Sequence, residues 1–329
     1  MSKVSVNLVT WNGANYIIGC LESLFAQTYP DFSLMIIDNG STDETVELIN
    51  EKYPHLRIVK HRDNLGFAKA HNQAIHWTDG EYVLLLNQDI ILEPNFIEKL
   101  VQFADTQEKG GAFTGKILRL QDSQKTKYID SLGLKIFKNH RTIDLGAGEL
   151  DESQYDAVEE VFGVSGAIPL YRRSALQAVQ MDKQFFDEDF FSYKEDVDLA
   201  YRLRYAGWKA FKVPISIAYH DRTIAVPQKD MSKIQLAKAR RGRSKFANYY
   251  SYRNHWFFLI KELPSTKLKY LFPVLRFELL KFFYILFLET SNLKTIKEVW
   301  NKRKHFQAKR KIIKEKQKIK TEEIDSWFA

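Results

Sequence analysis

The stretch YVLLLNQD, residues 82–89, decides how the surrounding sequence is interpreted. A short, continuous apolar run that polar residues end is typical of a strand buried on both faces of a parallel sheet. This run ends at Asn87, Gln88 and Asp89. The sequence therefore predicts a central strand that carries a carboxylate to one edge of a sheet.

Strand and helix patterns alternate around this central strand. Strands are predicted at VSVNLVTW (4–11), FSLMIID (32–38) and LRIVKH (56–61), and helices at 16–27, 39–53 and 64–77. This order indicates an α/β fold with a mostly parallel sheet and helices on both faces. Later segments predict a helix at EDVDLAYRLRYAG (195–207) and a pair of strands in KAFKVPISIAYH (209–220), broken at Pro214.

Length and composition limit the class of protein. The chain has 329 residues, of which 45% are hydrophobic, and this is enough for one large domain with an appendage. Its one cysteine, Cys20, permits no disulfide framework, which suits a reducing cytoplasm. The N-terminal MSKVSVNLVTWN lacks the features of a secretion signal.

Charge divides the chain into two parts. Residues 1–229 carry a net charge of −7 and residues 230–329 a net charge of +15. We expect a globular domain over 1–229, with halves at 1–120 and 121–229, and a helical, basic and aromatic region over 230–329 that meets different partners. The longest uncharged run in the aromatic segment 270–289 is FFYILFL, far shorter than the roughly 20 residues of a membrane-spanning helix.

Polar residues follow several predicted strands. Ligands of parallel α/β sheets bind outside the carboxyl ends of the strands, so residues there are expected to share one pocket. The candidates are Thr10, Asn12, Asp38 and Asp89 at strand ends, and Asn64, Gly66 and Asn72 around the turn into a helix. Each one alone is more simply explained as a cap or turn residue, as Asp38 is in DNGSTD, and it is their coincidence at four places that favours a shared pocket. Since no glycine-rich phosphate loop is present, a bound nucleotide would need a metal ion to neutralise its phosphates.

Two further segments hold ionisable candidates. The cluster FDEDFFSYKEDVDL (186–199) is either a plain acidic helix N-terminus or the source of a general base, because apolar neighbours around Glu195 and Asp196 would raise a carboxyl pKa. His220 ends a strand and is either structural or a metal ligand beside Asp89.

Taken together, these segments resemble glycosyltransferase family 2, the inverting enzymes of the GT-A fold. The resemblance covers residues 4 to about 220 in the family's order, through VNLVTWNGANYIIGCLESLFAQTYPDFSLMIIDNGSTDETVE, RDNLGFAKAHNQAI, YVLLLNQDIIL, GVSGAIPLYRRSAL and FFSYKEDVDLAYRLRYAGW. The forms NLGFA and EDVDLAYRLR are most similar to the rhamnosyltransferase-like branch, which transfers deoxysugars from nucleotide donors during polysaccharide assembly.

The resemblance implies a role for each candidate. Asp196 would be the catalytic base, and Asp89 and His220 would hold Mg²⁺ or Mn²⁺. Glu195, Asp198, Gly166 and Ala167 would form the acceptor side, and Thr10, Asn12, Asp38, Asn64, Gly66, Asn72 and Asn87 would line the nucleotide sugar. The implied reaction is a single displacement onto a hydroxyl of a glycan or lipid-linked glycan. Asn87 departs from the family pattern, which can carry an Asp there, and is the one support for the alternative of a degenerate, non-catalytic scaffold.

Three interpretations of the basic region 230–329 remain open: binding to nucleic acid, a solvated helix, or a helix on an anionic membrane surface. We favour the membrane surface, since enzymes of this kind often use lipid-linked acceptors. The implied location is then the cytoplasm, at the inner face of the cytoplasmic membrane, with no nucleic-acid partner.

Overall fold

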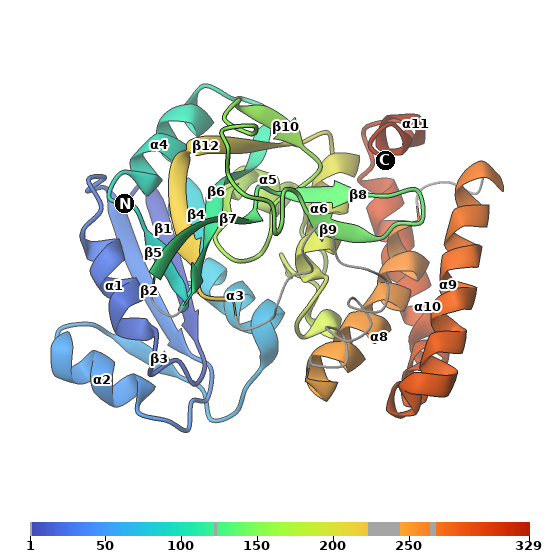
Figure 1. Cartoon of the computed structure of the whole chain (residues 1–329), viewed down its shortest axis with the longest axis horizontal. Helices are drawn as coiled ribbons and strands as arrows, with labels where there is room; N and C mark the ends of the chain where they lie inside the picture. The colour runs from blue at the N-terminus through green and yellow to red at the C-terminus, as the bar shows by residue number, and fades with distance from the viewer. Residues whose placement is uncertain (1, 122–123, 223–243, 264–267) are drawn as a thin grey trace.

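Residues 2–121, 124–222, 244–263 and 268–329 are described by the structure, a computed structural model. The expected boundary at residue 229 lies outside these residues. Figure 1 shows a central sheet flanked by helices, with the C-terminal helices α8 to α11 gathered on one side.

The first half alternates strands and helices as its sequence predicts. Its elements are β1 (Val4–Thr10), α1 (Ile17–Phe25), β2 (Phe32–Asp38), α2 (Thr45–Lys52), β3 (Ile58–Lys60), α3 (Gly66–His76), β4 (Tyr82–Asn87), β5 (Ile90–Leu92), α4 (Phe96–Asp105) and β6 (Gly110–Gln121).

The second half begins with short strands and ends in helices. Its elements are β7 (Gln124–Ser131), β8 (Leu134–Ile136), β9 (Thr142–Asp144), β10 (Glu159–Val161), β11 (Leu170–Arg172), α5 (Arg173–Val179), η1 (Glu188–Phe190), α6 (Glu195–Tyr205), β12 (Lys209–His220), α8 (Lys245–Glu262), α9 (Leu268–Leu288), η2 (Thr290–Leu293), α10 (Lys294–Glu315) and α11 (Thr321–Asp325).

One sheet organises the molecule, in the order β10-β12-β6-β11-β4-β1-β2-β3. Strands β4, β1, β2 and β3 are all parallel, and β11 enters antiparallel between β4 and β6. The α/β class predicted from the alternating pattern is confirmed. The antiparallel β11 follows from a chain that returns to the middle of the sheet without a crossover helix.

Strand β4 is central because both of its faces are covered. Leu84 and Leu86 pack in the core that includes α1 and α4, and Val83 and Leu85 pack in the core that includes α3, α5 and α6. The continuous apolar run is therefore required by burial on two sides.

The segment 209–220 differs from the prediction of two strands. It forms one long strand, β12, whose pairing with β6 shifts register between Val213 and Ile217. Proline has no N–H to donate to a ladder, and the irregularity around Pro214 accommodates this without ending the strand.

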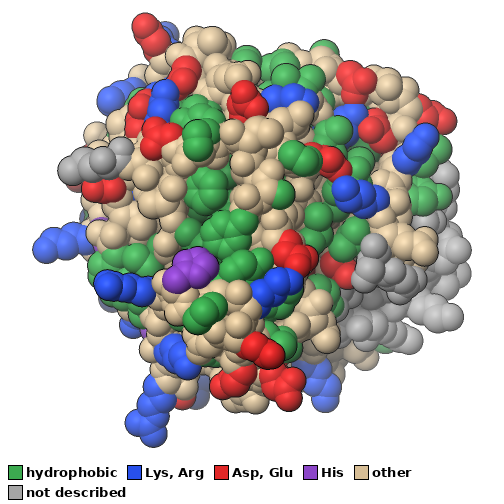
Figure 2. Space-filling view, turned by 90° about the vertical axis from the view of Figure 1, so that its left-hand side faces the viewer, with side chains coloured by type: hydrophobic (Ala, Val, Ile, Leu, Met, Phe, Trp, Pro, Cys, Tyr) green, Lys and Arg blue, Asp and Glu red, His purple; other side chains and the backbone are tan. Residues whose placement is uncertain are grey.

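The C-terminal helices share a core with the sheet domain. Phe257 and Phe258 of α8 and Phe306 of α10 lie in the same cluster of buried residues as Phe190 and Tyr201. Figure 2 shows the molecule from the left-hand side of Figure 1, and acidic and basic side chains are interspersed on this face.

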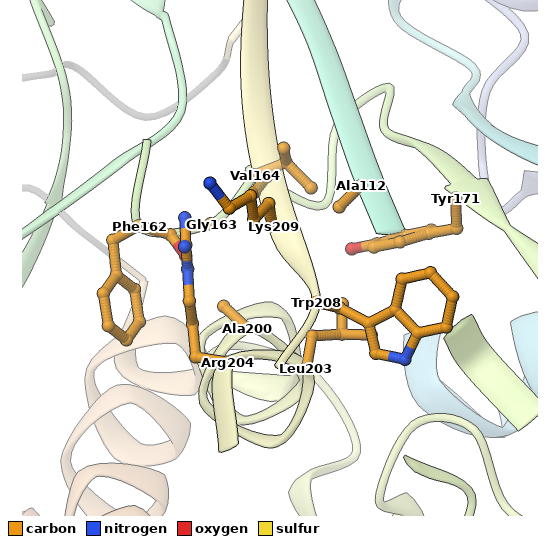
Figure 3. A pocket seen from close by; sticks show the side chains of 11 residues that line it. Ala112, Phe162, Gly163, Val164, Tyr171, Ala200, Leu203, Arg204, Trp208 and Lys209 are labelled. Atoms are coloured by element: carbon orange, nitrogen blue, oxygen red, sulfur yellow. The ribbon is translucent and has the colours of Figure 1, made fainter. Parts of the chain in front are cut away.

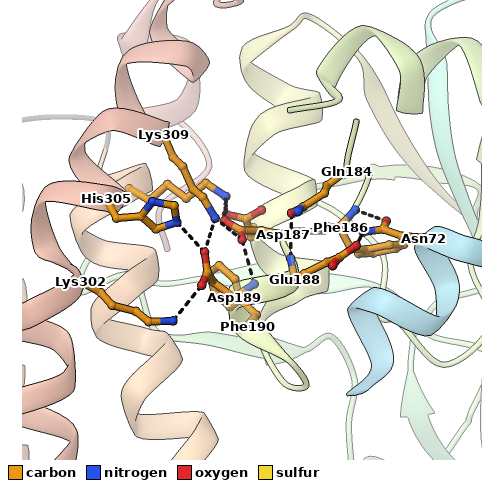
Figure 4. Close-up of polar contacts among 12 residues, drawn as sticks. Asn72, Gln184, Phe186, Asp187, Glu188, Asp189, Phe190, Lys302, His305 and Lys309 are labelled. Carbon is orange, nitrogen blue, oxygen red and sulfur yellow. Dashed lines mark hydrogen bonds and ion pairs between the residues drawn. The ribbon is translucent and has the colours of Figure 1, made fainter. Parts of the chain in front are cut away.

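Acidic and basic segments meet each other, contrary to the expectation of separate partners. Lys261 of α8 and Lys309 of α10 lie 2.7 Å and 2.5 Å from the Asp187 carboxylate, and Lys309 and Lys302 lie 2.6 Å and 2.9 Å from Asp189 (Figure 4). The prediction was wrong for these residues because net charge along the sequence does not reveal which charges pair after folding.

Candidate active site

Three of the predicted strand ends lie side by side. In the parallel register, Thr10 of β1 pairs with Asp38 of β2, and Val9 pairs with Asn87 of β4. Because β1 lies between β2 and β4, the residues that follow these strands reach the same edge of the sheet. The structure thus brings Thr10, Asp38 and the Asn87–Asp89 segment together as predicted.

Asp38 retains an unused acceptor in a buried position. Its side chain is 3% exposed, and its Oδ2 accepts a hydrogen bond from the Ser41 backbone N–H at 3.2 Å. Its Oδ1 is buried without a hydrogen-bond partner among the described residues. A buried, unsatisfied carboxylate oxygen is costly, and a ligand N–H would satisfy it.

The loop after β1 is closed by a residue that the sequence did not single out. Gln88 Oε1 accepts hydrogen bonds from the Thr10 hydroxyl at 2.5 Å and the Trp11 backbone N–H at 2.8 Å. Asn12, at φ 48°, accepts from the Thr42 backbone N–H through its Oδ1 at 2.8 Å. Thr10 and Asn12 therefore help to hold the loop that follows β1.

The turn before α3 is also held from within. Asn64 Oδ1 accepts from the Gly66 backbone N–H at 2.8 Å and from Asn39 Nδ2 at 3.0 Å. Gly66 has φ +82°, and a Cβ there would lie 2.6 Å from the Phe191 carbonyl oxygen. A glycine is needed for both reasons, which joins this turn to the segment before α6.

Asn72 lies in the interior and does not face the strand-end pocket. Its side chain accepts from the backbone N–H groups of Phe185 and Phe186 and donates to the Phe186 carbonyl and to Glu188 (Figure 4). These bonds fix the 185–188 segment, so we leave Asn72 out of the donor site predicted from the sequence. Its place on the buried face of α3, between Ala68 and Ile75, was a signal for this.

Asp89 and His220 lie together although they are far apart in the sequence. Antiparallel pairing of β5 with β12 sets His220 opposite Ile90, and His220 Nε2 lies 3.4 Å from Asp89 Oδ2. The other ring nitrogen, Nδ1, lies 2.8 Å from Asp130 Oδ2. Burial lowers the pKa of His220, but hydrogen bonds to Asp130 and Asp89 outweigh it and raise that pKa to about 9.

These residues fit a divalent cation. Asp89 Oδ1 is buried without a hydrogen-bond partner among the described residues, and carboxylate plus imidazole is a common ligand pair. Asp130, which the sequence analysis missed, orients the ring as an outer-shell carboxylate commonly does beside a ligating histidine. Over the described ranges no group of three or more His, Cys, Asp or Glu side chains is arranged to hold a metal ion, so the candidate protein ligands here are two, Asp89 and His220.

Arg222 links this pair to the next carboxylates. Its Nη1 lies 3.0 Å from Asp144 Oδ2 and 3.4 Å from Asp130 Oδ1. Burial lowers the pKa of Arg222, but the charges of Asp144 and Asp130 more than offset this and raise it. The guanidinium therefore stays charged beside the site.

Asp196 lies in the first turn of α6 and contacts the predicted acceptor floor. Its Oδ2 accepts from the Gly166 backbone N–H at 3.1 Å, and its Oδ1 accepts from the Val197 N–H at 2.7 Å. Burial, and then the nearby charge of Asp144, raises the pKa of Asp196. The carbonyl of Ala167 accepts from the Asn87 N–H at 3.2 Å, which ties this floor to the end of β4.

The other two carboxylates of this motif differ from Asp196. Glu195 is buried, and burial together with the charge of Asp196 raises its pKa well above the usual range. Asp198 is fully buried and lies 2.8 Å from Arg202 and 2.6 Å from Lys261. Since the first pair lies within α6 and the second holds α6 to α8, we assign Asp198 a structural role and leave it out of the acceptor site predicted from the sequence.

An enclosed pocket lies away from these residues, between α6 and the sheet. Ala112, Phe162, Tyr171, Arg204 and Trp208 are among the residues around it (Figure 3). Its volume is about 10 Å³, room for a single water molecule, so it cannot hold a sugar nucleotide.

Comparison with known proteins identifies the family of the chain. Residues 5–179 match the sequence profile described as "Glycosyl transferase family 2". Over 236 residues the chain is 30% identical to the N-acetylglucosaminyl-diphospho-decaprenol L-rhamnosyltransferase of Mycobacterium tuberculosis, which covers 64% of this chain and 74% of that protein. It is 40% identical over 98 residues to a chondroitin synthase of Pasteurella multocida, covering 29% of this chain and 10% of that protein.

Among solved structures, the fold is similar to that of GalNAc-T7, crystallised with UDP, GalNAc and Mn²⁺. The superposition has a TM-score of 0.56 at 14% identity and covers 82% of this chain and 53% of that one. This likeness shows a shared fold.

Proposed function

Because this chain belongs to glycosyltransferase family 2, we propose that it moves a sugar from a nucleotide-diphosphate donor to a hydroxyl of a lipid-linked glycan, with inversion at the anomeric carbon. One observation carries the proposal: the unsatisfied carboxylate of Asp38, the Asp89–His220 pair and the Asp196–Gly166 contact belong to one edge of the sheet. The similarity to the mycobacterial rhamnosyltransferase supports a deoxysugar such as L-rhamnose, from dTDP-rhamnose, as the transferred group.

On the donor side, Asp38 accepts the ring N–H of the pyrimidine base through its free oxygen. Thr10 and Asn12 hold the loop that borders the base, and the turn at Asn64 and Gly66 borders the ribose and diphosphate. Asn87 lies at the end of β4 beside this path.

A divalent cation, Mg²⁺ or Mn²⁺, held by Asp89 and His220 would stabilise negative charge on the departing diphosphate. Asp130 keeps His220 Nδ1 engaged, so that Nε2 faces Asp89. The remaining ligand positions then fall to donor oxygens and water, since Asn87 is a weaker ligand than the carboxylate it replaces.

On the acceptor side, Asp196 removes the proton of the attacking hydroxyl. Its raised pKa makes it a better base than an ordinary aspartate, and two backbone N–H groups hold its orientation. Burial and the charge of Asp196 also raise the pKa of the neighbouring Glu195 well above its usual range. The hydroxyl oxygen attacks the anomeric carbon as the bond to the diphosphate breaks, which inverts the configuration.

We place this reaction in the cytoplasm, at the inner face of the cytoplasmic membrane. A decaprenol-linked acceptor is named for the mycobacterial relative, and such acceptors are membrane lipids. No helix in the described part of the chain is both long and apolar enough to span a bilayer, so the attachment would be peripheral.

The test is a panel of dTDP-, UDP- and GDP-sugars with purified protein, with Mn²⁺ or Mg²⁺ and with chelator. We expect metal-dependent hydrolysis of one donor class, with dTDP-rhamnose preferred. The matched variant is Asp196→Asn, with Asp156→Asn, a surface carboxylate, as its control. If no donor is bound or hydrolysed in the presence of Mn²⁺ or of Mg²⁺, the proposal is wrong.

A further inference from the structure

Helix α9 presents an apolar side to solvent. Val274, Glu278 and Ile285 face the protein and are buried. At spacings of three or four residues, the other side carries Phe272, Leu275, Leu279, Phe283 and Phe287, which are 45–73% exposed. We call these five residues the outer stripe. Figure 1 shows α9 at the edge of the molecule. An exposed apolar patch of this extent marks an interaction surface.

A groove of about 500 Å³ runs between α9 and the loop that joins β8 to β9. Its apolar wall comes from both sides, with Phe137 on the loop and Phe272, Phe277 and Leu280 on the helix. Its cations are Lys138, Arg141 and Arg276. Since Phe272 belongs to the groove and to the outer stripe, the two surfaces are continuous.

The three cations of the groove are available to a ligand. No carboxylate in the described part of the chain lies within ion-pair distance of Lys138, Arg141 or Arg276, and all three are exposed. Arg141 stacks over the Phe137 ring at 5.0 Å from its centroid. This contrasts with Lys261 and Lys309, whose charges are consumed by Asp187. Three cations without an ion pair to the described residues, beside an apolar surface, match a phosphate attached to a long apolar chain.

A short path joins the groove to the candidate active site. Arg141 immediately precedes β9, and Asp144 at the end of β9 lies 3.0 Å from Arg222. Asp144 is also near enough to Asp196 to raise its pKa. A phosphate held at Arg141 would therefore lie one short strand from Asp144, whose charge acts on the proposed base Asp196.

We propose that this groove binds the phosphate of a membrane-embedded, long-chain lipid that carries the acceptor sugar, while its apolar chain and the outer stripe enter the bilayer together. Lys138, Arg141 and Arg276 bind the phosphate, and Phe272 and Leu280 contact the chain. The inference rests on the proposed function for the identity of the acceptor. It adds the site at which the lipid is recognised and the orientation of the enzyme on the membrane.

Vesicle flotation of the full chain tests the proposal without any sugar donor. Phosphatidylcholine vesicles with a few mole per cent of a polyprenyl phosphate are compared with vesicles of phosphatidylcholine alone. We expect binding to favour the first, and the K138Q/R141Q/R276Q variant to bind them on the order of 100-fold more weakly. The K304Q/K311Q/K318Q variant removes the same charge from exposed positions outside the groove and should bind like the wild type.

A second pair of variants addresses the apolar surface. Phe272→Ser with Phe283→Ser should lower binding to both kinds of vesicle, with a melting temperature equal to or above that of the wild type, since exposed residues are replaced. Equal binding of the wild type to the two kinds of vesicle would overturn the proposal. An equal loss of binding in K138Q/R141Q/R276Q and in K304Q/K311Q/K318Q would also overturn it. Competition by inorganic diphosphate at a concentration no higher than that of the polyprenyl phosphate would indicate a site for free anions and would also overturn it. If lipid binding is as expected but no donor is hydrolysed, the proposed function fails and the lipid site stands.

Discussion

His220 Nε2 lies 3.4 Å from Asp89 Oδ2, and Asp130 holds the opposite nitrogen of the same ring at 2.8 Å. This contact depends on β12 running antiparallel to β5 at the rim of the sheet. A carboxylate and an imidazole in this position make a two-ligand cation site that donor oxygens can complete.

The first prediction concerns this pair. Asp89→Asn and His220→Ala should each abolish Mn²⁺ binding in the presence of a nucleoside diphosphate, measured by titration calorimetry. Asp130→Asn should weaken it by about 10–100-fold, because the ring loses its orienting carboxylate. Asp31→Asn, at the opposite end of β2, is the control and should bind as the wild type does. Undiminished Mn²⁺ binding in His220→Ala would show that His220 is not a ligand of the metal.

The second prediction separates chemistry from donor binding at Asp196. Asp196→Asn should lower transfer by about 10²–10⁴-fold, since proton removal is lost, and leave donor affinity nearly unchanged. Loss of both would mean that Asp196 belongs to the donor site.

The third prediction is a pH profile for the same residue. A base must be deprotonated to act, so transfer should rise with pH through the pKa of Asp196. Because burial and Asp144 raise that pKa, the acid limb should lie above the pKa of an ordinary aspartate, about 3.9. The measurement is the rate of transfer against pH at saturating donor and acceptor. A limb at or below the ordinary value would contradict the assignment.

The fourth prediction concerns the buried ion pairs between Asp187 and the C-terminal helices. Lys261→Met should lower the free energy of unfolding by about 3–5 kcal/mol, because it removes the one cation that two buried carboxylates, Asp187 and Asp198, share. Lys302→Met removes a 40% exposed partner of Asp189 and should cost less than about 1 kcal/mol. Urea unfolding distinguishes them, and equal effects would argue against a buried pair.

Acid should weaken the same ion pairs. Burial raises the pKa of Asp187, but Lys261 and Lys309 outweigh burial and lower that pKa to about 2. A carboxyl whose pKa is depressed on folding stabilises the protein above its unfolded pKa, about 3.9, and this contribution is lost as pH falls towards about 2. Between a pH of about 3.9 and a pH of about 2, the free energy of unfolding should therefore fall less in Lys261→Met than in the wild type.

The fifth prediction compares two glycines with the same backbone conformation. Gly66 and Gly207 have φ +82° and +81°, but an added Cβ would lie 2.6 Å from a backbone oxygen at Gly66 and 3.6 Å from the nearest atom, a side-chain carbon, at Gly207. Gly207→Ala should cost about 1 kcal/mol of unfolding free energy for the conformation alone. Gly66→Ala should cost clearly more, because the Phe191 backbone must also move. Thermal unfolding measures both, and equal costs would show that the Phe191 segment yields freely.

Sequence reasoning was most successful where local pattern and sheet geometry agree. The strands that end at Thr10, Asp38 and Asn87 were predictable from apolar runs bounded by polar residues, and parallel pairing then brings their ends together. Asp89, Asp196 and His220 were found through motifs after β4, at the start of α6 and at the end of β12. Gln88, Asp130 and Arg222 were missed, because each matters only through a partner far away in the chain.

The sequence alone predicted the elements of the fold and most of the polar residues at the carboxyl edge of the sheet, since periodicity and strand ends are local properties. Tertiary packing decided which of those polar groups remain free. Asn72 and Asp198 are consumed by internal contacts, whereas Asp38 and Asp89 each keep a buried, unsatisfied oxygen. The same holds for charge: Lys309 is neutralised by Asp187, and Arg141 is left facing a groove. Pairing between distant residues is a property of the folded chain, because only folding brings the partners within reach.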